Sequence, residues 1–327
     1  MFVNVKRKGL LLVLALIMIT VLAGCGPKSS GTIVEGKVNV VTTFYPIYEF
    51  AKEIGGEDVN AINLLPVGVE PHDWTPRSQD IVNTSKAQLF LYNGAGLEGW
   101  VPNFLKGLDS DSAVESVEVS QGIDYIMTNE EDEHGHGHES GEAETAEHEG
   151  EDSLHTDPHT WVSPKSALIM AENIKNSLQK VDPSHKDGYE ARFNTLADRL
   201  KELDTTFTTE LSKLPNKEIV VSHQAFAYLC RDYGLVQHAI MGLSPDAEPR
   251  GQDLVDLAEM VKADNIKYIF FEELVSDKLA KTLASETGVS TMVLNPVEGL
   301  TEQQEKAADN YFTLMEKNLQ NLILALQ

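Results

Sequence analysis

Residues 189–214, YEARFNTLADRLKELDTTFTTELSKL, decide the fold. The large apolar residues of this segment fall at i, i+3, i+7, i+10 and i+14, which places them on one face of a helix. A helix of about 26 residues spans roughly 39 Å, long enough to run the length of a two-lobed molecule. We predict a helix that connects two lobes, although the pattern alone also permits a surface helix of one lobe. The residues on the apolar face are Phe193, Leu196, Leu200, Leu203 and Phe207.

Short apolar runs alternate with helical patterns on both sides of this segment. Such alternation predicts mostly parallel sheets flanked by helices. We expect an α/β protein with an N-terminal lobe over residues 38–186, a connecting helix over 187–214 and a C-terminal lobe over 215–327. The expected strands are 38–43, 59–65, 87–92, 114–119, 218–222, 236–241, 267–271 and 291–294. The expected helices, besides the connector, are 47–54, 78–85, 100–108, 225–233, 252–264, 277–287 and 302–326.

The first 24 residues have the pattern of a secretion signal and are excluded from the expected fold. A basic cluster precedes an apolar run over residues 10–23, which is shorter than the roughly 20 residues that a membrane-spanning helix needs. The run ends in LAGC at residues 22–25, which looks like a bacterial lipobox. We predict a signal peptide over residues 1–24 and a tether over 25–37, anchored in the lipid bilayer through lipidated Cys25 on the extracytoplasmic side. The alternative is a plain signal anchor with an incidental cysteine.

Acidic residues outnumber basic residues by 51 to 26, which gives a formal net charge of -25. A surface of this sign repels nucleic acid and anionic membrane surfaces, and it attracts cations. We therefore expect no nucleic-acid partner, and we expect the ligand to be a cation.

Residues 129–153 break the alternation of strands and helices. Between residues 130 and 152 the chain has eleven Asp or Glu, no Lys or Arg, and four His. So few apolar residues cannot offset the entropy of ordering the segment, and we predict a mobile loop of the N-terminal lobe. Histidines that alternate with glycine favour an auxiliary metal site, while an acidic loop with incidental histidines is the alternative. The four histidines are His134, His136, His138 and His148.

Three other histidines lie where ligands bind in α/β proteins. His72 and His223 follow predicted strands, one in each lobe, and ligands bind outside the carboxyl ends of parallel strands. His159 ends the acidic segment and, like His72, follows a proline that restricts the backbone presenting the ring. Taken singly, each of the three is equally compatible with a structural role. His185 in a turn and His238 on a strand are expected to have structural or surface roles.

Four motifs together resemble one protein family, the zinc solute-binding lipoproteins of bacterial ABC importers. They are LPVGVEPHDWTPRSQD at residues 65–80, DPHTWVSP at 157–164, VSHQAFAYL at 221–229 and VLNPVEGLT at 293–301. The resemblance covers essentially the whole chain after the signal and includes the lipobox and the His-rich insert. It implies two α/β lobes joined by one rigid helix, with a metal in the cleft between them.

The resemblance also implies the ligands and the partners. Carried over by position, His72 and His159 would bind the metal from the first lobe, and His223 and Glu298 from the second. Three imidazoles and a carboxylate suit Zn²⁺, whereas manganese-binding relatives replace a histidine with a carboxylate. Glu298 competes with Glu272, or with water, for the fourth position. We expect a monomer that delivers Zn²⁺ to an ABC permease and its ATPase.

Other functions and other roles for nearby carboxylates stay open at this point. The chain could bind manganese or a broader set of divalent metals, or act as a metal-dependent surface adhesin. A zinc hydrolase is the least favoured alternative, because the sequence has no His-Glu-x-x-His signature and four ligands leave no position for substrate. Carboxylates should orient the histidine rings, and the candidates are Asp73, Asp157 and Glu272.

Overall fold

The computed structural model describes residues 31–128, 155–246 and 249–327. The predicted signal peptide, the predicted lipidation site Cys25 and the histidines of the predicted loop, residues 134–148, lie outside these ranges. Within them, no helix combines the length and the apolar character needed to cross a bilayer.

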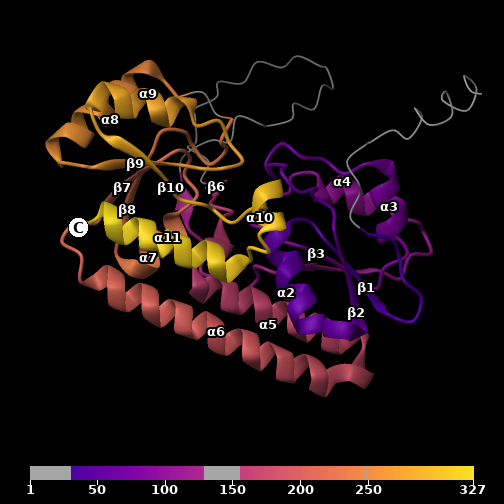
Figure 1. The fold of residues 1–327 in the computed structure, drawn as a ribbon. Coiled ribbons are helices and arrows are strands. Elements are labelled where there is room, and N and C mark those ends of the chain that lie inside the picture. Colours follow the sequence, from indigo (N-terminus) through magenta and orange to yellow (C-terminus); the bar gives the residue numbers. More distant parts are fainter. Residues whose placement is uncertain (1–30, 129–154, 247–248) are drawn as a thin grey trace, which may run out of the picture.

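The N-terminal lobe is built on a four-stranded parallel sheet (Figure 1). Its strand order is β2-β1-β3-β4, so that β1 lies inside the sheet with Val38 opposite Val59 of β2. The strands are β1 (Val38–Thr42), β2 (Val59–Asn63), β3 (Leu89–Tyr92) and β4 (Glu115–Glu118). The helices between them are α2 (Tyr45–Gly55), the short η1 (Gly56–Asp58), α3 (Ser78–Thr84) and α4 (Val101–Lys106).

The C-terminal lobe repeats this plan with a second parallel sheet of order β10-β9-β7-β8. Its strands are β7 (Glu218–Val221), β8 (Val236–Ala239), β9 (Tyr268–Phe271) and β10 (Ser290–Val293). Its helices are α7 (Ala227–Tyr233), α8 (Gly251–Ala263) and α9 (Lys278–Thr287). The predicted fold class, two α/β lobes with parallel sheets, is confirmed.

The long helix α6 (Lys186–Ser212) runs beneath both lobes in Figure 1, as expected of a connector. All five residues of its predicted apolar face are buried. A second helix, α5 (Pro164–Val181), precedes α6 and packs along it. The short helix η3 (Pro183–His185) joins the two. We did not predict α5, although its buried residues Met170, Ile174 and Leu178 follow the same helical spacing.

The predicted continuous helix over residues 302–326 is wrong. The chain forms α10 (Glu302–Lys306), leaves the helix, and begins again as α11 (Tyr311–Ala325). Ala308 between them takes a positive φ of 57°, and the Asn310 side chain accepts a hydrogen bond from the backbone N–H of Thr313. Asparagine is among the strongest N-caps, so Asn310 starts a new helix inside the segment predicted as one helix.

One apolar core continues from one lobe into the other. It includes Val40 of β1, Leu200 of α6 and Val221 of β7. Aromatic pairs cross the junction: Phe50 of α2 meets Tyr311 of α11 edge-on, with 5.0 Å between the ring centroids. The lobes are therefore joined by packing as well as by the connecting helix.

Replacing Leu200 with alanine should lower the free energy of unfolding by about 2–5 kcal/mol, because the side chain is fully buried and alanine preserves helix propensity. Urea unfolding followed by circular dichroism measures the loss. Lys201→Ala, on the exposed side of the same helix, should change stability by less than about 0.5 kcal/mol. Equal losses in the two variants would contradict the role assigned to this face.

Candidate metal centre

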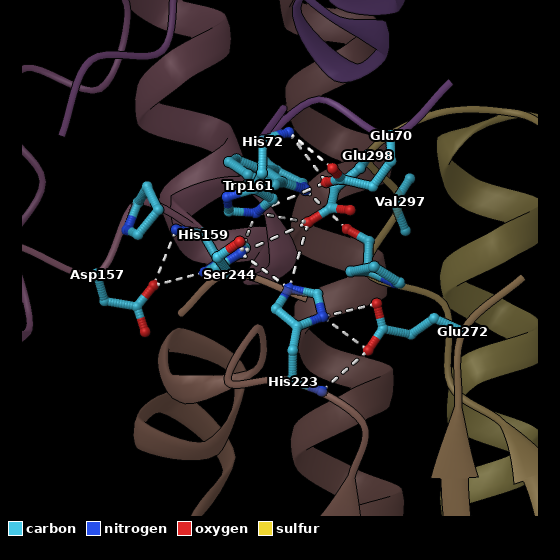
Figure 2. Close-up of polar contacts among 12 residues, drawn as sticks. Glu70, His72, Asp157, His159, Trp161, His223, Ser244, Glu272, Val297 and Glu298 are labelled. Atoms are coloured by element: carbon cyan, nitrogen blue, oxygen red, sulfur yellow. Dashed lines mark hydrogen bonds and ion pairs between the residues drawn. The ribbon is translucent and has the colours of Figure 1, made fainter. Parts of the chain in front are cut away.

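Four loops bring three histidines and one glutamate to a single point between the lobes (Figure 2). His72 lies in the loop after β2, and His223 follows the end of β7 directly. Glu298 lies in the turn after β10. His159 lies between β6 (His155–Thr156), which pairs with β5 (Met127–Thr128), and the short helix η2 (Thr160–Val162). We call these four residues the metal centre.

Five of the six separations between the ligand atoms are close to those of a tetrahedron around a small cation. His159 Nε2 lies 3.1 Å from His72 Nε2 and 3.2 Å from His223 Nε2. Glu298 Oε1 lies 3.6, 3.5 and 3.7 Å from the Nε2 atoms of His72, His159 and His223. Bonds of about 2.0–2.1 Å to a tetrahedral Zn²⁺ would separate the ligands by roughly 3.3–3.4 Å. The arrangement matches that size.

Two buried carboxylates fix the orientation of two of the rings. Asp157 Oδ1 lies 2.9 Å from His159 Nδ1, and a carboxylate oxygen of Glu272 lies 2.7 Å from His223 Nδ1. In the neutral rings, Nδ1–H donates to the carboxylate and Nε2 presents its lone pair to the centre. Lone pairs that converge at this distance repel one another unless a cation lies between them.

The metal centre is shielded from water. His159 and His223 are fully buried, Glu298 is 1% exposed, and the His72 side chain is 8% exposed. Glu298 Oε1 is buried and has no hydrogen-bond partner among the residues that the structure describes. A buried carboxylate oxygen without a partner is costly, and a bound cation would satisfy it. The donor atoms present therefore fit a divalent metal.

Burial and charge shift the pKa values of the metal centre in opposite directions. Burial lowers the pKa of His72. Burial also acts to lower the pKa of His159 and His223, but Asp157 and Glu272 outweigh it and raise both. Burial alone would raise the pKa of Glu298, yet the three imidazole rings, whose Nε2 atoms lie 3.5–3.7 Å from Oε1, hold it well below its usual value. The carboxylate is thus ionised, and a metal must displace protons from the rings.

Of the three carboxylates expected to orient rings, Asp157 and Glu272 do so. Glu272 lies on the Nδ1 side of His223, away from the point where the four ligand atoms meet, so the geometry favours Glu298 as the fourth ligand. Asp73 instead lies with Glu70 and Asp246, whose carboxylates gather within 4.8 Å of one another.

Sequence reasoning missed Glu70. Both of its carboxylate oxygens accept from the backbone N–H of His72 at 3.0 Å. Burial, followed by repulsion from Glu298, raises the pKa of Glu70 to about 8. Its place two residues before a candidate ligand was the available signal.

The loop between β6 and η2 is held by side chains from the C-terminal lobe. Tyr228 Oη donates to the carbonyl oxygen of Asp157 at 2.8 Å, and Tyr311 Oη donates to that of Trp161 at 2.8 Å. The Trp161 indole Nε1–H donates in turn to the carbonyl oxygen of Pro296 at 2.7 Å. The segment that carries one ligand is therefore tied directly to the turn that carries another.

The family of zinc-uptake complex component A, periplasmic, matches residues 40–325. The chain belongs to this family. The resemblance drawn from the four motifs is thereby confirmed.

Two proteins named for zinc binding or zinc uptake are similar in sequence to this protein along almost its whole length. The zinc-binding protein AdcA of Streptococcus pyogenes is 41% identical over 321 residues, which are 97% of this chain and 61% of AdcA. The chain thus spans about three fifths of the length of the AdcA relatives that it matches. The high-affinity zinc uptake system protein ZnuA of Bacillus subtilis is 40% identical over 321 residues, which are 97% of each protein.

The fold is shared with a zinc-bound structure. The Zn(II)-bound ZnuA-like domain of Streptococcus pneumoniae AdcA superposes with a TM-score of 0.73 and 38% sequence identity. The match covers 89% of this chain and 99% of that domain.

Removing the Glu272 carboxylate should weaken zinc binding by about 10- to 100-fold, because His223 loses the partner that fixes its ring. Removing Glu298 should weaken it more, because a ligand itself is lost. Competition of Glu272→Ala and Glu298→Ala against a zinc chelator measures the order. Glu286→Ala, exposed on α9, is the control and should bind like the parent protein. The opposite order would make Glu272 the fourth ligand.

Proposed function

We propose that this protein is the extracytoplasmic zinc-binding component of an ABC importer. It captures one Zn²⁺ at the metal centre and delivers the ion to a membrane permease driven by its ATPase. The convergence of three Nε2 atoms and Glu298 Oε1 on one buried point carries the proposal. Imidazole nitrogens suit Zn²⁺ better than manganese, which prefers oxygen.

Partners and location follow from the family and from the sequence. A binding protein has no energy source of its own, so uptake requires a permease and an ATPase. The names of the relatives, a zinc uptake system protein and a zinc-binding protein, support this role. We further propose that Cys25 carries the lipid that holds a monomeric protein beside the permease, and that the net charge of -25 draws cations toward it.

We expect no catalysis at the metal centre. A catalytic zinc keeps a position open for water or substrate, whereas four protein ligands close the tetrahedron. The shielding of the centre from solvent supports storage of the ion rather than turnover.

Replacing His159 or His223 with alanine should lower zinc affinity by more than about 100-fold, because a lost ligand exceeds the usual effect of an outer partner. Chelator competition and metal analysis of the purified protein measure this, with one tightly bound Zn²⁺ per parent chain. His185→Ala and His238→Ala are matched controls, because these rings contact Asp182 and Glu218 and do not belong to the cluster of four ligands.

The same variants test transport. In a strain that lacks the gene, the parent protein and His185→Ala should restore growth under zinc limitation, whereas His159→Ala should not. Uptake that is unchanged by deletion of the gene, in a strain with no second zinc-binding protein, would overturn the proposed function.

The histidines at residues 134–148 are proposed as an auxiliary site that collects metal for the centre. The composition of the segment predicts that it is mobile, and a metal bound by a mobile segment must also order it, so affinity should be lower than at the centre. The ends of the segment are close together, because β5 and β6 pair antiparallel with Thr128 opposite His155. A short linker can therefore replace the segment.

Excision of residues 130–152 should abolish weak zinc binding and leave one tight site. Calorimetric titration resolves the two classes of site. Replacing the four histidines of this segment with serine, in the full-length chain, is the control for loop length and should give the same result. Loss of the tight site on excision would mean that the segment supplies a ligand to the metal centre, and His155→Ala would test the nearest candidate.

A further inference from the structure

The turn that presents Glu298 contains a strained residue. Val297 precedes Glu298 and takes a positive φ of 60° while its side chain is fully buried. For a β-branched residue this conformation is a genuine outlier, because its side chain crowds the backbone. Such strain persists only where the surroundings impose it. Something near this turn must therefore hold the backbone in place.

A chain of buried amides imposes the conformation. Asn295 Oδ1 accepts from the backbone N–H of Val297 at 2.7 Å. Asn318 of α11 binds the backbone of Asn295 on both sides: its Oδ1 accepts from the N–H at 2.8 Å, and its Nδ2 donates to the carbonyl oxygen at 2.6 Å. Asn318 is 1% exposed, so water does not compete for these bonds. The Asn318 side chain thus pairs with both backbone groups of Asn295, as the backbone of a neighbouring strand would.

Other contacts fix the flanks of the turn. Asn295 Nδ2 donates to Glu273 Oε2 at 2.8 Å, and the Pro296 carbonyl oxygen accepts from Trp161. Beyond Glu298, the Leu300 carbonyl oxygen accepts from the N–H of Gly68 at 2.8 Å. With both flanks fixed, a change of φ at residue 297 would swing the following carboxylate away from the three rings.

We propose that Asn318 is a positioning residue that holds the Glu298 carboxylate in the coordination sphere of the metal. The inference rests on the proposed function, since it gives a residue of the C-terminal helix α11 the role of positioning Glu298, the fourth ligand of the zinc site. Without the two hydrogen bonds, Val297 relaxes, Glu298 withdraws, and three histidines hold the ion. Because the carboxylate completes the tetrahedron, Asn318 governs both the affinity for zinc and the geometry around it.

A double-mutant cycle separates positioning from general support of the fold. Asn318→Leu, close in size and unable to make either hydrogen bond, should weaken zinc binding by about 10- to 100-fold in the parent protein. In the Glu298→Ala background, Asn318→Leu should weaken zinc binding by less than about 2-fold, because the carboxylate that Asn318 positions is already absent. Chelator competition measures all four proteins. Visible spectra of the Co²⁺-loaded proteins should place Asn318→Leu with Glu298→Ala and apart from the parent.

Asn321→Leu is the matched control. Asn321 lies on the same helix and donates to the carbonyl oxygen of Val293, before the turn, so its loss should leave zinc affinity and the Co²⁺ spectrum unchanged. Where Asn318→Leu does not fold, Asn295→Ala takes its place in the cycle, because it removes the acceptor of the Val297 N–H.

Two results would overturn the inference: an equal loss of affinity in both backgrounds, or parent-like binding by Asn318→Leu. A Glu298→Ala protein that binds zinc like the parent would instead refute the ligand set, and with it the site on which the proposed function rests.

Discussion

Four donor atoms that repel one another must meet at one buried point, and the rest of the structure serves this constraint. Three imidazole nitrogens and a carboxylate oxygen, each from a different loop, all lie within 4.8 Å of one another, and five of their six separations are between 3.1 and 3.7 Å. No local preference of the chain produces such a convergence. It requires two sheets whose strands end toward each other and a frame stiff enough to hold the loops against repulsion.

The frame is stiff because side chains of the C-terminal lobe form hydrogen bonds with a loop of the N-terminal lobe. The loop that carries His159 follows the N-terminal sheet in sequence, yet Tyr228 and Tyr311 of the C-terminal lobe fix its backbone. Trp161, which follows His159, donates a hydrogen bond to the carbonyl oxygen of Pro296 and so connects this loop to the turn that carries Glu298. A displacement of one lobe would therefore break buried hydrogen bonds beside the ligands. Together with the continuous core and α6, these bonds make the ligand geometry a property of the whole molecule.

Sequence reasoning succeeded where a pattern is local. The helical period identified the apolar face of α6, and strand–helix alternation gave both sheets. The four motifs named His72, His159, His223 and Glu298, which the structure brings together. It failed where a short-range signal divides a longer segment: the Asn310 cap interrupts the single helix predicted over residues 302–326.

Contacts between distant residues could not be predicted. Glu272 and His223 are 49 residues apart, and nothing in the sequence ranked Glu272 against Asp73 as the partner of that ring. Asn318 binds the backbone of Asn295, 23 residues earlier in the chain, and nothing in the helical pattern distinguishes it from Asn321 of the same helix. Such partners are fixed by tertiary packing, which a single sequence does not display.

The continuity of the core has a consequence for the survival of the protein outside the cytoplasm. Because the two lobes share one core and one set of ligands, an ion bound at their junction opposes the opening of both. At a free zinc concentration a thousand times the dissociation constant, this linkage is worth about 4.1 kcal/mol, a thousandfold reduction in the population of opened molecules. Proteases that cut opened chains would meet correspondingly few of them. The metal-bound protein should therefore outlive the metal-free protein, so that scarcity of the metal shortens the lifetime of the protein.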